Sequence, residues 1–217
     1  MPTTESLTLW VDAFFISPYA FSSFVVSKEK DLPFDTRLVP FHEKAQHEKA
    51  YRDRSLTSRV PTLTHGSFDL SESSAIDEYL DETFAPPTYP AVYPRDPRAR
   101  ARVRQVQAWL RSDLMALREE RSANTMFYEH AQEPLSPAGR AAAEKLVGVV
   151  ERILPEGAAH LIGDWCIADS ELAFMFHRLI LNGDPLPDRL RRYAALQWQR
   201  ASVREWVERE RPRYVPY

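Results

Sequence analysis

Glycine is scarce in this chain. Its 217 residues contain six glycines, and these are never clustered. The GxGxxG and GxxxxGK loops that hold nucleotide phosphates need closely spaced glycines, as does the GxSxG turn of serine hydrolases. None of the three motifs can be drawn from this sequence, which excludes those classes of protein.

Cysteine is scarcer still, because Cys166 is the single cysteine and cannot form an internal disulfide. One thiol is typical of proteins from a reducing compartment, so we expect a cytoplasmic protein. The six histidines are scattered. His42 and His47 are five residues apart, whereas the HExxH zinc motif needs four. We therefore expect no metal site and interpret these histidines as solvated residues.

Long apolar runs and strong net charge are also missing. No run approaches the ~20 apolar residues of a membrane helix, and the first ten residues lack the pattern of a signal peptide. The net charge is −3 and no long basic tract occurs, so neither a membrane nor a nucleic acid is an expected partner. The 44% hydrophobic content is that of an ordinary globular protein.

The predicted secondary structure changes near the middle of the chain. The first part alternates strand and helix signals, and Ser17-Pro18 is a good helix start because it combines an N-cap residue with proline at the first helical position. The expected elements are strands at 7–11, 34–39, 61–64 and 68–70, helices at 17–30 and 71–82, and a weak helix at 42–55. A proline-rich stretch follows, and beyond it helical patterns predominate, at 98–120, 137–154, 169–182, 186–198 and 202–209.

This organisation predicts an α/β domain followed by an all-α domain. Residues 1–83 form the first, with an element order that resembles thioredoxin, and residues 95–217 form the second. Residues 84–94 are a linker, because their prolines stop any helix.

Four motifs in this order and spacing resemble the cytosolic glutathione transferases. They are Ser17-Pro18 after the first strand, Val60-Pro61 before the third, Glu72-Ser73 opening a helix, and the stretch 161–169, LIGDWCIAD, in the helical domain. The phrases QAWLRSDLM, DWCIAD and QWQRASV look most like the bacterial YfcF-like branch. The resemblance implies the glutathione transferase fold, serine-type chemistry and a homodimer, with glutathione as co-substrate and no metal.

By this resemblance Ser17 is the catalytic residue that holds the glutathione sulfur. A free thiol titrates near pH ~8.5, so an enzyme that needs the thiolate must lower that pKa. A hydroxyl at a helix N-terminus suits this task, because it can donate to the anion where the helix dipole also favours negative charge. The alternative is a plain N-cap. Tyr19 is a second candidate for the same role.

The resemblance also implies a glutathione-binding set. Val60 and a cis Pro61 would pair with the peptide backbone, and Arg59 would reach the glycine carboxylate. Glu72 would bind the ammonium of the γ-glutamyl group, and Ser73 with the free N–H groups of its helix would bind the carboxylate. The structural alternatives are an ordinary trans proline, a surface arginine and a helix N-terminus stabilised by an acidic residue.

The expected reaction is attack of the thiolate on an electrophile, with reduction of organic hydroperoxides as a possible second activity. Candidates for the second-substrate pocket are Phe14 and Phe15, and on one helix face at i, i+4, i+7 spacing Arg111, Met115 and Arg118. The same residues could instead be core and solvated side chains. A glutathione-dependent isomerase or dehalogenase would use the same site. The non-enzymatic alternative is a glutathione-transferase-like protein that keeps the fold as a protein-binding module.

Asp169 is expected to cap the central helix of the second domain. The resemblance implies Ser or Thr three residues earlier, but this chain has Cys166 there, whose thiol is a poor hydrogen-bonding group. We expect a weaker cap and interpret Cys166 as a small buried residue. No cysteine lies near position 17, which argues against thiol–disulfide exchange and dehydroascorbate reduction.

Overall fold

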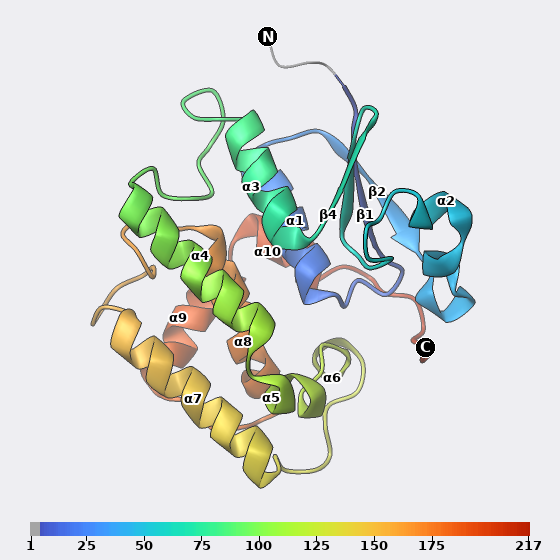
Figure 1. The fold of residues 1–217 in the computed structure, drawn as a ribbon. Helices are drawn as coiled ribbons and strands as arrows, with labels where there is room; N and C mark the ends of the chain where they lie inside the picture. The colour runs from blue at the N-terminus through green and yellow to red at the C-terminus, as the bar shows by residue number, and fades with distance from the viewer. Residues whose placement is uncertain (1–4) are drawn as a thin grey trace. The chain divides into compact units, whose positions relative to one another are not determined.

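The computed structural model describes residues 5–217, whose contacts divide them into two compact units (Figure 1). Unit 1 combines the chain up to Val92 with residues 205–217, and unit 2 comprises Tyr93–Arg204. Residues 1–4, part of the stretch inspected for a signal peptide, lie outside the described residues. Within the described part no helix combines the length and apolar character needed to span a membrane.

Unit 1 is built on a four-stranded sheet in the order β2-β1-β3-β4. The strands are β1 (Leu7–Asp12), β2 (Phe34–Val39), β3 (Thr62–His65) and β4 (Phe68–Ser71), and the helices are α1 (Pro18–Glu29), α2 (Lys49–Arg52) and α3 (Ser73–Thr83). Short 3-10 turns occupy Phe41–Glu43 and Ala45–His47. β1 runs parallel to β2 and antiparallel to β3, which pairs antiparallel with β4. The thioredoxin-like fold predicted from the sequence is confirmed.

Helices α1 and α3 pack together through a buried polar contact. The hydroxyls of Ser22 and Ser23 donate to the two carboxylate oxygens of Asp77 at 2.7 and 2.8 Å. All three side chains are buried, so each polar atom needs its partner. This pairing fixes α3 against α1 and with it the start of each helix.

Unit 2 is helical, as the sequence predicts. Its helices are α4 (Pro97–Ser112), α5 (Met115–Glu120), α6 (Asn124–Phe127), α7 (Pro137–Ile153), α8 (Ile167–Ile180) and α9 (Asp188–Trp198), and α10 (Ala201–Val207) begins in it. Helix α8 is buried along almost its whole length, which fits its apolar composition. Residues 205–217, expected with the helical domain, make their contacts in unit 1.

The single helix expected at 98–120 is wrong at one point. Leu114 has φ +63°, and Asp113 accepts a hydrogen bond from the Leu114 N–H at 2.7 Å, so the chain leaves the helix and starts α5. An aspartate that bonds nearby backbone offers the chain an alternative to the helix. The i, i+4, i+7 spacing of Arg111, Met115 and Arg118 therefore does not describe one continuous helix face.

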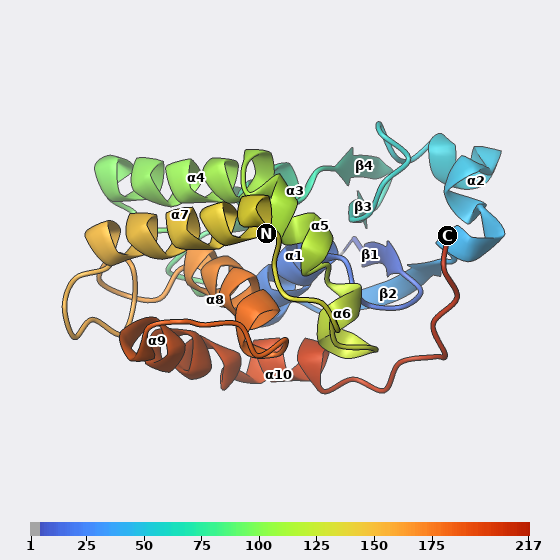
Figure 2. The ribbon, with the colours of Figure 1, turned by 90° about the horizontal axis from the view of Figure 1, so that it is seen from below.

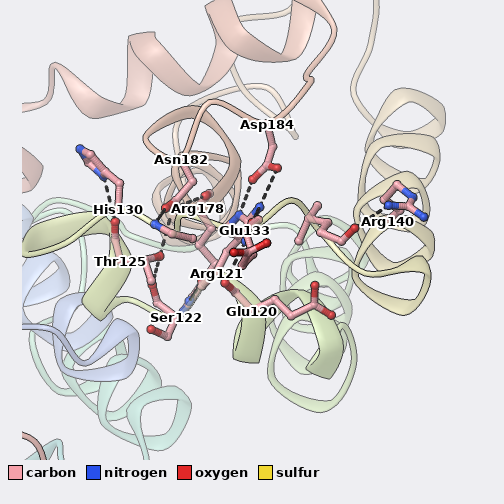
Figure 3. A network of polar contacts seen from close by, with 12 residues as sticks. Glu120, Arg121, Ser122, Thr125, His130, Glu133, Arg140, Arg178, Asn182 and Asp184 are labelled. Atoms are coloured by element: carbon pink, nitrogen blue, oxygen red, sulfur yellow. Dashed lines mark hydrogen bonds and ion pairs between the residues drawn. The ribbon is translucent and has the colours of Figure 1, made fainter.

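A largely buried ion pair joins Arg121, at the end of α5, to Asp184, which follows α8 (Figure 3). The Arg121 guanidinium donates to both carboxylate oxygens of Asp184, at 2.5 and 3.0 Å, and to the carbonyl of Glu133. Arg178 donates to the carbonyl of Arg121 at 2.7 Å. Asn182 adds a bond to Thr125 at 3.0 Å. These contacts hold the long α5–α7 connection, including α6, against α8.

Candidate functional site

The strand register brings three of the sequence motifs in unit 1 to the same end of the sheet's strands. Trp10 pairs with Thr62, and Thr62 pairs with Ser71. The end of β1, the start of β3 and the end of β4 are therefore neighbours. Val60-Pro61 directly precedes β3 and Glu72-Ser73 directly follows β4, whereas Ser17-Pro18 follows β1 after the turn at residues 13–16. The fold thus assembles the three motifs from distant parts of the sequence.

Ser17 is the N-cap of α1, as predicted. Its Oγ accepts a hydrogen bond from the Ala20 N–H at 3.2 Å, and Pro18 occupies the first helical position. Since the oxygen accepts this bond, the hydroxyl hydrogen is available for a second partner. Tyr19 lies one position further along the same helix and is partly buried. A partly buried hydroxyl at a helix N-terminus can stabilise an anion.

Asp12 holds the turn that presents Ser17. Its carboxylate accepts hydrogen bonds from the backbone N–H groups of Ile16 and Ser17, both at 2.9 Å, and the side chain is 1% exposed. Burial raises the pKa of Asp12, and the hydrogen bonds from those N–H groups oppose the rise. The sequence analysis missed this residue. Its signal is an acidic side chain at the end of a buried strand, four and five residues before the groups it binds.

Val60 and Pro61 lie beside a buried tyrosine. The Val60–Pro61 bond is cis, as the resemblance implies. The Tyr51 hydroxyl donates to the Arg59 carbonyl at 2.7 Å, and Ser55 donates to the same oxygen at 3.1 Å. These bonds fix the backbone that enters β3. The Arg59 side chain is exposed, so its role in binding stays a prediction.

Glu72 and Ser73 stand at the start of α3. Glu72 has φ +76°, a left-handed conformation that is uncommon outside glycine and is often associated with functional sites. Its carboxylate accepts a hydrogen bond from Thr57 at 3.1 Å. The side chain of Glu72, the N-cap residue, makes no capping hydrogen bond to this helix start. Its first N–H groups are thus donors suited to an anion, with the Glu72 carboxylate next to them.

The candidates for the second-substrate pocket lie in both units. Phe14 and Phe15 in unit 1 are buried, at 2% and 7% exposed. In unit 2, the Arg111 guanidinium binds the Glu171 carboxylate with both of its terminal nitrogens, at 3.0 and 2.7 Å. Met115 is 50% exposed, and Arg118 donates to the Arg111 carbonyl. A pocket role for these residues stays a prediction.

His42, which the sequence analysis interpreted as solvated, is partly buried and is a second residue that it did not assign to the site. It lies in the turn after β2, with its ring 5.1 Å from that of Phe14. Among the described residues, its buried Nδ1 atom has no hydrogen-bond partner. A buried ring nitrogen next to the Ser17 turn is a candidate ligand-binding group.

Cys166 is buried, as expected, and lies against Asp169 in unit 2. Burial and the negative charge of Asp169 raise the pKa of its thiol. Because the thiolate is the reactive form, we expect Ellman's reagent at pH 8 to leave the native thiol unmodified and to titrate one thiol per chain in denaturant. Stoichiometric labelling of the native protein would contradict this expectation.

The chain matches two family models of one superfamily. The model described as the N-terminal domain of glutathione S-transferase matches residues 13–88, and that described as the C-terminal domain matches residues 96–210. Together with the thioredoxin-like unit and the helical unit, these matches define the class. The chain belongs to the glutathione S-transferase family.

Individual relatives agree with this assignment. Human glutathione S-transferase theta-1 is 33% identical over 138 residues, which cover 61% of this chain and 55% of the relative. Arabidopsis thaliana glutathione S-transferase T3 is 28% identical, over 89% of this chain and 33% of the relative. The chain thus matches between a third and about half of the length of these two relatives.

Solved structures give the likeness in three dimensions. A glutathione transferase homolog from Burkholderia GL BGR1 with bound glutathione is 43% identical, with a TM-score of 0.76 over 94% of this chain and 97% of that one. A theta-class glutathione S-transferase from Xanthomonas axonopodis pv. citri with bound glutathione is 20% identical, with a TM-score of 0.74 over 95% and 99%. At that lower identity the second structure supports the fold alone.

Proposed function

We propose that this protein is a serine-type glutathione transferase that binds glutathione in unit 1, at the end of the sheet where the three motifs meet. The observation that carries the proposal is the convergence of a serine N-cap, the start of β3 and the start of α3, whose N-cap side chain makes no capping bond. These three features match the three parts of glutathione, which are a thiol, a peptide backbone and an amino-acid head group. The 43% identical Burkholderia structure, which has bound glutathione, supports the same ligand.

Each group has a chemical task in this proposal. The Ser17 hydroxyl donates to the glutathione sulfur and lowers the thiol pKa, with the dipole of α1 adding to the effect. The Val60 backbone pairs with the cysteinyl backbone. Ser73 and the first N–H groups of α3 bind the γ-glutamyl carboxylate, and Glu72 binds its ammonium. Arg59, before β3, and His42, after β2, lie on chain segments at the same end of the sheet and are donors for the glycine carboxylate.

The bound thiolate then attacks the electrophilic centre of a second substrate and displaces its leaving group. In unit 1 we assign Phe14 and Phe15 to the binding of that substrate, and in unit 2 Arg111, Met115 and Arg118 stay candidates from the sequence. With an organic hydroperoxide, the thiolate would attack the terminal oxygen and release the alcohol, and a second glutathione would reduce the resulting sulfenic acid to disulfide and water. A cytoplasmic homodimer that detoxifies electrophiles is the setting implied by the resemblance to cytosolic transferases.

Glu72→Gln should weaken glutathione binding about tenfold or more, because a charge-assisted bond to the ammonium contributes roughly 1.5–3 kcal/mol. Isothermal calorimetry measures the affinity. Glu82→Gln is the matched control, since Glu82 is an exposed carboxylate on the last turns of the same helix and should leave the affinity unchanged.

Wild type that fails to bind millimolar glutathione would overturn the proposal and favour the protein-binding alternative. Equal affinities of wild type and Glu72→Gln would remove Glu72 from the site but leave the ligand in place.

A further inference from the structure

The end of the chain lies against the turn that presents Ser17. Residues 205–217 belong to unit 1, although almost the whole sequence separates them from that turn. Figure 2 shows the segment leaving α10 and ending beside the α2 region. Its last residue, Tyr217, packs on Phe41 with ring centroids 5.2 Å apart and on Phe14 at 6.2 Å. We call residues 208–217 the C-terminal tail.

Trp206 anchors this segment. It is fully buried, and its ring centroid lies 5.3 Å from that of Phe15, 6.2 Å from Phe21 and 5.2 Å from Phe24. Phe21 and Phe24 belong to α1, the helix that Ser17 caps. Trp206 therefore packs on residues from both sides of the candidate catalytic serine in the sequence, Phe15 before it and Phe21 and Phe24 after it.

Arg211 links the tail to the Ser17 turn by hydrogen bonds. Its guanidinium donates to the carbonyls of Trp206, Val207 and Arg209 at 2.9, 3.0 and 3.0 Å, which are at and just beyond the end of α10. The same group donates to the carbonyl of Phe15 at 3.3 Å. One side chain thus ties a helix end to a residue 196 positions earlier.

Phe15 needs such support, because it adopts φ +51°. For a residue other than glycine, this left-handed conformation costs roughly 1–2 kcal/mol. The residue is held on three sides. Its N–H donates to the Asp12 carbonyl at 3.1 Å, the Arg209 guanidinium lies 4.4 Å from its ring centroid, and Arg211 binds its carbonyl. Two residues beyond Phe15 is Ser17.

We propose that Arg211 is a positioning residue, which fixes the Ser17 hydroxyl for the glutathione thiol through its bond to the Phe15 carbonyl. Asp12 holds the turn through the N–H groups of Ile16 and Ser17, and Arg211 holds it through a carbonyl, so the two charged groups restrain opposite polar atoms of one turn. A shift of the hydroxyl by a fraction of a bond length would weaken its bond to the sulfur. The proposal rests on the function proposed above.

Arg211→Ala should raise the pKa of bound glutathione by roughly one unit, which is a tenfold smaller thiolate fraction below that pKa. The pKa is measured on the full-length protein from the ultraviolet absorbance of the thiolate against pH. At a pH below the wild-type value of this pKa, kcat should fall about tenfold while the KM for glutathione stays within about twofold, because the peptide contacts at Val60 and Glu72 are intact. Arg213→Ala is the matched control, since Arg213 is an exposed arginine two residues further along.

A double-mutant cycle with Ser17→Ala separates positioning from general stability. Without the serine hydroxyl, Arg211→Ala should change neither the thiol pKa nor kcat further. If Arg211→Ala does not fold, Arg211→Lys takes its place. Lysine keeps the positive charge at the helix end but cannot reproduce the guanidinium fork, so an intermediate shift is expected.

A folded variant with the wild-type thiol pKa would overturn the inference, and so would an equal loss of kcat in the presence and absence of Ser17. Failure of the proposed function would give a different result in the same pKa measurement. In that case wild type would not lower the thiol pKa, or Ser17→Ala would not raise it, whatever Arg211 does.

Discussion

The Ser17→Ala variant should bind glutathione with nearly unchanged affinity but lose about 10²-fold in transferase rate near neutral pH, the usual effect of removing one donor to a reacting anion. The rate with a model electrophile, measured against pH, should reveal the cause. Wild-type rate should level off at the lowered thiol pKa, whereas the variant rate should keep rising toward the ordinary thiol value of ~8.5.

The same substitution also removes an N-cap, so a second variant is needed to separate the two effects. Glycine at the N-cap costs only a few tenths of a kcal/mol, against about 1 kcal/mol for alanine. Ser17→Gly should therefore lose as much rate as Ser17→Ala while keeping more stability. Ser112→Ala is a neutral control, because that exposed hydroxyl only bonds to its own helix, at the Ala108 carbonyl. Wild-type rates in both Ser17 variants would show that the hydroxyl has no catalytic role.

The largest effect on stability is expected at Asp169. This carboxylate is fully buried and accepts four hydrogen bonds, from the Leu161 N–H at 2.7 Å, the Cys166 N–H and thiol at 2.9 and 3.4 Å, and the Tyr193 hydroxyl at 2.6 Å. Asp169→Ala would leave these buried donors without an acceptor. Each unsatisfied buried group costs about 1–3 kcal/mol, so we expect a loss of at least ~3 kcal/mol in the free energy of unfolding.

Urea unfolding followed by circular dichroism measures this loss. Tyr193→Phe is the graded comparison, because it removes one donor and leaves the carboxylate with its other three bonds, for an expected loss of about 1 kcal/mol. Cys166→Ser should not destabilise the cap, since a hydroxyl donates better than a thiol to the same oxygen. A loss below about 1 kcal/mol in Asp169→Ala would contradict the view that this carboxylate holds the start of α8.

Local chemistry explains why much of the fold could be predicted from the sequence. Ser17 and Pro18 were enough to predict the start of α1, and β2 was expected at the residues where it occurs. The buried helix α8 is apolar enough to be identified by composition. The break at Leu114 was missed, because a leucine gives no signal for a left-handed conformation and the apolar spacing continues across it.

Some residues of the candidate site could likewise be predicted from the sequence, and others could not. Its motifs are short and contiguous, so each could be found by resemblance. Asp12 was missed although its partners are near in sequence, because an aspartate after a strand is equally at home in any turn. His42 and Arg211 were missed because their roles depend on what packs beside them. Arg211 acts across 196 positions, and no periodicity within one element reports such a contact.

The two-part composition of unit 1 has a consequence for how the protein is made. Unit 2 is one continuous segment, residues 93–204, so during synthesis the ribosome has made the whole of this unit once residue 204 is added. Synthesis of unit 1 starts before that of unit 2 and continues after it. The aromatic cluster around Phe21 and Phe24 can form only after Trp206 has been made. Although N-terminal domains generally fold first, the nascent chain would here carry an unfinished first domain until residues 205–217 have been made. A gene fragment cut after the helical domain would therefore encode an incomplete thioredoxin-like core.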